Sequence, residues 1–227
     1  SEQSTEWLRQ QITPNDIVPD SLPERAGLIV SFRIPDSDEA YPYLFSRSWI
    51  YDDALAIIAL TAKDAHAPAL TILNAMKGQV KDDGRIGFSY KTDEDWYDDK
   101  NHLSGAIAWV GYAFVFYQQE TGDIQSQATA ERTAQYLLLL QDRDTSSSSY
   151  GSIRGGPNAS WYSTADNIIA YFFLRDLGRL TQNDTYRQAA ELIKFSLMEH
   201  HWEEAQGRFF PTVGDSSKGL VETNSLG

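Results

Sequence analysis

The sequence contains no cysteine among its 227 residues. Disulfide bonds and thiolate zinc sites are therefore excluded as sources of stability. A chain of this length without cysteine is compatible with an oxidising compartment. We expect a secreted or periplasmic protein, with a cytoplasmic location as the alternative.

Basic residues are also scarce, because 19 lysines and arginines stand against 32 acidic residues and give a net charge of −13. Without a basic stripe to displace counterions from phosphates, we expect no nucleic-acid partner. No apolar run reaches the roughly 18 residues that a spanning helix needs, so we expect no membrane span. The four histidines show no metal-ligand spacing, and we expect neither a metal nor a cofactor.

What the sequence has in abundance is paired helical segments of about 15 to 20 residues. In each pair the first segment is apolar on nearly all faces, which predicts a buried inner helix, and the second is amphipathic, which predicts an outer helix. The spacing of the pairs is close to that of helical repeat proteins, whose hairpins bury their inner helices against neighbours. The predicted pairs are 48–63 with 68–81, 104–123 with 126–143, and 163–180 with 184–202.

The connections within a predicted pair are short, whereas the connections from one pair to the next are long. The long ones cover residues 82–103, 144–162 and 203–222. If the inner helices run parallel, these loops open at one end of the helices, where functional residues are usually placed. Residues 1–46 form a separate region rich in Pro, Asp and Ser, predicted to be an extended arm. Its one apolar run, 27–32, predicts a short strand.

Several of these segments resemble the six-hairpin glycosidases. The resemblance is carried by WIYDDALAIIAL (49–60), DGRIGFSY (83–90), AWVGYAFVFY (108–117) and YSTADNIIAYFFL (162–174). It implies an all-α (α/α) toroid over residues 47–227, with about three and a half hairpins of an apparently incomplete, truncated ring. A half ring would expose an apolar flank, so we expect a second chain or fragment to complete it.

Three aspartates at inner-helix N-termini are the candidate catalytic residues. Asp53 and its neighbour Asp52 open the first inner helix, and Asp166 opens the third. The free N–H groups and dipole of a helix N-terminus stabilise a carboxylate, which suits a base or a hydroxyl acceptor. Helix capping is the structural alternative, and Ser163 and Asp166 have the spacing of a capping box.

Aromatic, amide and guanidinium side chains in the loops are the candidate substrate-binding groups. Aromatic faces pack on the C–H faces of sugar rings, and amides or carboxylates bind hydroxyls. Calcium binding is an alternative for the acidic loop 91–101, although the loop lacks the glycine and final glutamate of an EF-hand. A solvated acidic loop without a ligand is the other alternative. The candidates are Trp161, Tyr162 and Asn167, Trp96 and Tyr97 of the acidic loop, Trp109 of the second inner helix, and the loop arginines Arg85 and Arg154.

The resemblance and these residues favour a glycoside hydrolase that uses two carboxylates on a neutral or weakly charged glycan. An oligosaccharide or polysaccharide is therefore the expected ligand. A non-catalytic glycan-binding or polysaccharide-assembly protein is the main alternative, because the same acids would serve as helix caps. A polysaccharide lyase or epimerase is a third possibility, which the net negative charge disfavours.

Overall fold

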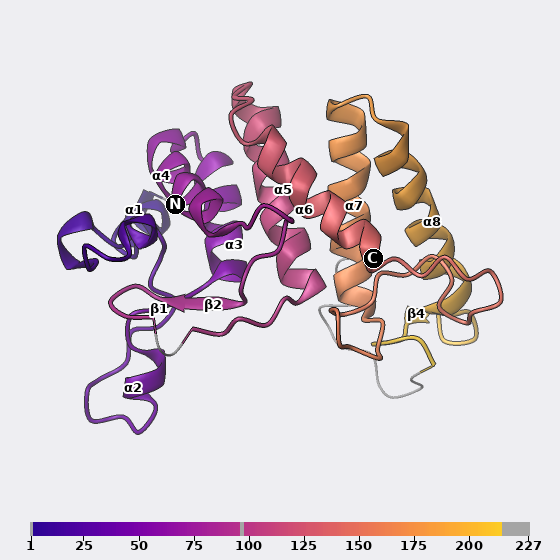
Figure 1. The fold of residues 1–227 in the computed structure, drawn as a ribbon, viewed down its shortest axis with the longest axis horizontal. Helices are drawn as coiled ribbons and strands as arrows, with labels where there is room; N and C mark the ends of the chain where they lie inside the picture. Colours follow the sequence, from indigo (N-terminus) through magenta and orange to yellow (C-terminus); the bar gives the residue numbers. More distant parts are fainter. Residues whose placement is uncertain (1, 96–97, 215–227) are drawn as a thin grey trace.

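The computed structural model describes residues 2–95 and 98–214, and three helical hairpins dominate it (Figure 1). The hairpins follow one another along the chain, and the inner helices α3, α5 and α7 pack side by side. Each inner helix also packs against the outer helix that follows it. The hairpins are α3 (Ile50–Thr61) with α4 (His66–Gln79), α5 (Ser104–Thr121) with α6 (Gln127–Leu139), and α7 (Thr164–Leu180) with α8 (Asp184–His200).

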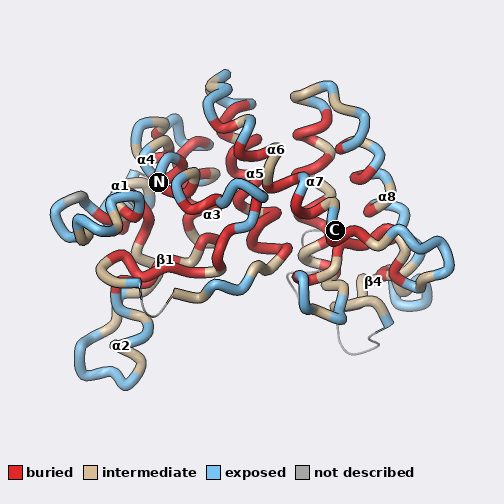
Figure 2. Tube along the Cα trace, viewed as in Figure 1, coloured by how far each residue is buried: buried red, intermediate tan, exposed pale blue. Residues whose placement is uncertain are grey.

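Each predicted helix is present, and the predicted alternation of burial is confirmed. Buried residues run along the inner helices, while the outer helices have one buried and one exposed side (Figure 2). The inner helices approach closely where α5 carries Gly111, because a Cβ there would lie 2.2 Å from the ring of the buried Phe173. A single apolar core therefore runs through all three hairpins.

The predicted gathering of the long connections at one end is confirmed for the residues that the structure describes, and residues 215–222 of the third connection lie outside them. The segments after α4, α6 and α8 lie together at the lower end in Figure 1, beside the N-termini of the inner helices. Two small antiparallel pairs organise them: β1 (Arg47–Trp49) with β2 (Ser89–Lys91), and β3 (Trp202–Glu203) with β4 (Arg208–Phe209). Side chains on these loops therefore lie close to the first turns of α3, α5 and α7.

The N-terminal region differs from the predicted extended arm in containing short helices. These are α1 (Glu2–Arg9), the 3₁₀ turns Asn15–Ile17 and Pro23–Arg25, and α2 (Tyr41–Leu44). The strand predicted over 27–32 does not form, although a bridge between Ile12 and Ile29 and backbone hydrogen bonds join this run to residues 11–13. Leu28 and Ile29 are nonetheless buried in the core, so this apolar run packs on the helices instead of joining a sheet.

Candidate active site

A cavity of about 340 Å³ lies where the first turns of the inner helices meet the long loops. This volume falls in the range of about 300–1,000 Å³ that ligand pockets usually have. Three inner helices and two long loops contribute to it. Its wall consists of Trp49, Tyr51, Phe88, Leu103, Gly105, Ala106, Trp109, Trp161, Ser163, Ala165 and Asp166.

One side of this cavity is aromatic because β1 pairs with β2. The register sets Trp49 opposite Ser89, and the rings of Trp49 and Phe88 lie 5.7 Å apart. Tyr51, in the first turn of α3, meets Trp109 of α5 edge to face at 5.5 Å. The strand pair and two inner helices thus present flat apolar surface to a ligand.

Asp166 is the one carboxylate among the described residues that line the cavity. It is the third residue of α7 and is half-buried. Its backbone N–H donates to Ser163 Oγ at 3.3 Å, which confirms the predicted cap by Ser163. Ser163 thus caps α7 through the backbone N–H of Asp166, and Asp166 itself lines the cavity.

The Trp161 side chain forms another part of the wall and is 41% exposed. Its carbonyl accepts a hydrogen bond from the Gly155 N–H at 3.0 Å. The Gly155 carbonyl in turn accepts from the N–H of Ser104, the first residue of α5, at 3.1 Å. The loop before α7 is therefore fastened to the N-terminus of α5, and it holds an indole face beside the cavity.

Asp53 lies outside this cavity and is fully buried beneath the N-terminal region. Its carboxylate accepts hydrogen bonds from the Ile29 N–H at 2.8 Å and from Ser48 Oγ at 2.6 Å. Burial raises the pKa of Asp53 to about 7, although these two hydrogen bonds act in the opposite direction. The position gives Asp53 the role of an anchor that joins residues 28–30 to α3.

Asn167 has the corresponding position in α7, because both residues are fourth in their helices. It is fully buried, and its amide bonds both the N–H and the carbonyl of Ile153, at 2.6 and 3.0 Å. Asn167 thus anchors the preceding loop and does not line the cavity. Asp52 lines a separate groove of about 290 Å³ between α1 and α3.

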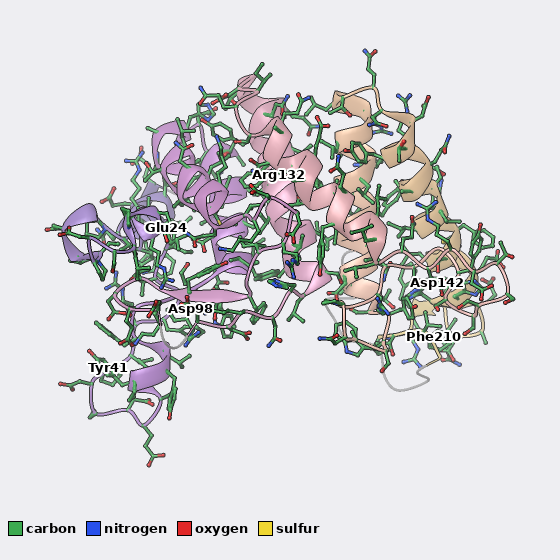
Figure 3. The ribbon with its side chains drawn as sticks, viewed as in Figure 1. Glu24, Tyr41, Asp98, Arg132, Asp142 and Phe210 are labelled. Carbon is green, nitrogen blue, oxygen red and sulfur yellow. The ribbon has the colours of Figure 1, made fainter. Side chains whose placement is uncertain are left out.

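Three acids of the loop after β2, Asp93, Glu94 and Asp98, lie within ion-pair distance of basic side chains. Arg25 is buried and donates to the carbonyls of Lys91 and Glu94 and to both carboxylate oxygens of Asp98. Figure 3 labels Asp98 next to β2, where this contact is made. The Lys91 ammonium lies 2.5 Å from the Glu94 carboxylate. A guanidinium therefore binds the carbonyls and carboxylate that a calcium ion would need.

Among the remaining predicted aromatic residues, Trp109 lines the cavity. Tyr162 does not, and its side chain hydrogen-bonds Asp142 in the loop after α6. Trp96 and Tyr97 lie outside the described residues. Of the aromatic residues that line the cavity, Trp109 and Trp161 were predicted from the sequence and the others were not.

The loop arginines do not line the cavity. The Arg85 guanidinium lies 2.6 Å from the Asp83 carboxylate in its own turn, and Arg208 Nε lies 2.7 Å from Glu203. Arg154 is partly buried, and its Nε has no hydrogen-bond partner among the described residues. Arg85 and Arg208 are thus each paired with a carboxylate of their own turn.

Four large side chains of the cavity were not predicted from the sequence: Trp49, Tyr51, Phe88 and Leu103. Each lies within three residues of an inner helix N-terminus or beside a short strand. Trp49, Tyr51 and Leu103 share one signal, a large apolar or aromatic residue where an inner helix begins, whereas Phe88 lies next to β2. Pairing of β1 with β2, which joins segments about 40 residues apart, could not be read from either segment alone.

No protein-family model and no curated protein sequence matches the chain. Among solved structures, an unsaturated glucuronyl hydrolase from Bacillus sp. GL1 superposes with a TM-score of 0.71 at 13% identity, covering 98% of this chain and 64% of that chain. A family 8 endoglucanase from Klebsiella pneumoniae gives 0.62 at 13% identity, covering 89% and 61%. A D-mannose isomerase gives 0.71 at 12% identity, covering 98% and 60%.

These structures show the fold: the chain is built as an (α/α) toroid of helical hairpins, like six-hairpin glycosidases. The chain spans about 64% of the length of the glucuronyl hydrolases that it matches. Because one fold carries many activities, function must be argued from the cavity itself. Within residues 2–95 and 98–214, no helix is long and apolar enough to cross a bilayer.

Proposed function

We propose that this chain is a carbohydrate-active protein, in the first instance a glycoside hydrolase, whose cavity binds a glycosyl unit. The observation that carries the proposal is the combination of five aromatic side chains with the Asp166 carboxylate in one cavity wall. A pyranose ring has apolar C–H faces and polar edges, so aromatic rings can cover the faces while a carboxylate binds a hydroxyl. The similar solved structures include glycosidases, which agrees with this ligand class.

The ligand that this wall suits best is a neutral or weakly charged glycan. None of the described lining residues is lysine, arginine or histidine, and the whole chain has a net charge of −13. A polyanionic sugar would therefore approach a negative protein without a cation in the wall to receive it. In this respect the cavity offers no support for a lyase, which needs positive charge next to its uronate.

Non-catalytic glycan binding is the second candidate, and one observation favours it. Hydrolysis by the usual route uses two carboxyl groups, as acid and as base or nucleophile. Among the described lining residues only Asp166 is a carboxylate, while Asp53 is buried elsewhere and Asp52 lines another groove. A hydrolase would need a second acid or base that approaches the cavity when substrate is bound.

The test measures reducing-end release and binding with cellohexaose, maltohexaose and mannohexaose, for the wild type and for Asp166→Asn. Removing a catalytic carboxylate should lower turnover at least about 100-fold and leave measurable binding. Asp64→Asn is the matched control, because its side chain is 97% exposed and it follows α3 at the end away from the cavity. Binding without turnover in the wild type would favour the second candidate, and unchanged turnover in Asp166→Asn would remove Asp166 from the reaction.

A further inference from the structure

Two side chains of the cavity wall lie where a neighbouring residue lacks a side chain. A Cβ built on Gly105 would lie 2.1 Å from Asp166 Oδ1 and 2.5 Å from its Cγ. A Cβ built on Gly155 would lie 2.0 Å from two atoms of the Trp161 indole. Ordinary van der Waals contact starts at 3.4 Å, so neither side chain could keep its position beside an alanine.

Backbone conformation does not require glycine at these two positions. The glycines with positive φ are others in the chain, and Gly105 is the second residue of α5 with a helical backbone. Glycine weakens a helix relative to alanine because it loses more conformational freedom on folding. The close approach of Asp166 and Trp161 is therefore the structural reason for the missing Cβ.

We propose that Gly105 and Gly155 are positioning residues. Each leaves the space that a side chain of the cavity wall occupies, Asp166 in the case of Gly105 and Trp161 in the case of Gly155. This inference rests on the proposed function, because it relates the positions of Asp166 and Trp161 to glycan binding. Gly105 lets the Asp166 carboxylate of α7 lie against the first turn of α5, where the helix dipole favours negative charge. Leu103, the N-cap of α5, supplies no side-chain cap of its own. Gly155 leaves the space that the Trp161 indole occupies.

A purely structural role, in which glycine only allows elements to pack closely, makes a different prediction. Gly111 provides the comparison, because its Cβ would lie 2.2 Å from Phe173, a fully buried ring with no room to move. Asp166 is half-buried and Trp161 is 41% exposed, so both side chains can rotate away from an added methyl group. Alanine at 105 or 155 should thus disturb the cavity, whereas alanine at 111 should disturb the core.

The experiment compares Gly105→Ala, Gly155→Ala and Gly111→Ala by thermal unfolding and by kinetics on the oligosaccharide, among the three above, that the wild type binds best. Gly105→Ala should lower kcat/KM roughly 100-fold through a displaced carboxylate, and Gly155→Ala should raise KM with a smaller effect on kcat. Both should keep Tm within a few degrees of the wild type. Gly111→Ala should lower Tm by roughly 5 °C and leave kcat/KM within a few-fold of the wild type.

Crystal structures of Gly105→Ala and Gly155→Ala separate a failure of this inference from a failure of the proposed function. The inference expects the Asp166 carboxylate and the Trp161 indole to move by more than about 1 Å, whatever the protein binds. Unmoved side chains, or moved side chains with unchanged kinetics, would overturn it. A wild type that binds none of the oligosaccharides would contradict the proposed function alone.

Discussion

Replacing Asp53 with asparagine should make the free energy of unfolding rise more steeply with pH than it does in the wild type. Folding shifts the pKa values of two buried groups in opposite directions. Burial raises the pKa of Asp53 from 3.8 to about 7, and burial lowers the pKa of His201 from 6.5 to about 4. His201 is fully buried, with Nε2 2.8 Å from Ser152 Oγ and Nδ1 2.7 Å from Thr164 Oγ1.

The sign of each contribution follows from which state binds more protons. Between pH 4 and 7 native Asp53 keeps a proton that the unfolded chain releases, so its contribution to the free energy of unfolding falls as pH rises, by about 4 kcal/mol in all. Between pH 4 and 6.5 unfolded His201 binds a proton that the native state excludes, so its contribution rises with pH, by about 3 kcal/mol. The contributions of Asp53 and His201 therefore oppose each other between pH 4 and 6.5.

The assay is urea unfolding at pH 4, 5, 6 and 7, followed by far-UV circular dichroism. Relative to the wild type, Asp53→Asn should gain about 3 kcal/mol more free energy of unfolding between pH 4 and 6.5, and His201→Asn should instead lose stability over the same interval. Parallel curves for Asp53→Asn and wild type would refute the reasoning, because they would mean that native Asp53 is ionised throughout.

Three further substitutions test the anchors and the core by urea unfolding. Arg25→Leu should cost about 3–5 kcal/mol, because it leaves the Asp98 carboxylate, 4% exposed, without its partner; a cost below 1 kcal/mol would show that the loop finds another cation. Asn167→Leu should cost roughly 2–4 kcal/mol, since two buried backbone groups of Ile153 lose their partner; unchanged stability would contradict an anchoring role. Phe173→Ala should cost about 3–5 kcal/mol through a core cavity, and a smaller loss would indicate a core that collapses around the gap.

The sequence predicted the helical architecture well because burial alternates from helix to helix with a clear period. For example, α5 has an apolar residue on every face from Ala106 to Tyr117, which only a helix surrounded by others can bury. The N-terminal region was harder to predict. α1 has no buried residue, and Leu28 and Ile29 are buried in the helical core without forming a strand. The second chain or fragment predicted to complete the ring stays a prediction.

The candidate site was predicted less completely, and Asp53 and Asp166 show why. Both are acids in the first turn of an inner helix, and the sequence distinguishes them poorly. Which face each carboxylate occupies depends on a rotation of about 100° per residue and on what packs there. The third residue of α7 reaches the cavity, whereas the fourth residue of α3 lies under Ile29.

The central claim is that the aromatic cavity at the N-termini of α3, α5 and α7 holds a glycosyl unit beside Asp166. The most direct measurement is a titration of the wild type and of Trp109→Ala with the three neutral hexasaccharides, using isothermal calorimetry. The account predicts saturable binding of at least one of them by the wild type, and weakening of that binding by roughly 10-fold or more when the Trp109 ring is removed. Equal affinity in both proteins, or no binding of any of the three to the wild type, would contradict it.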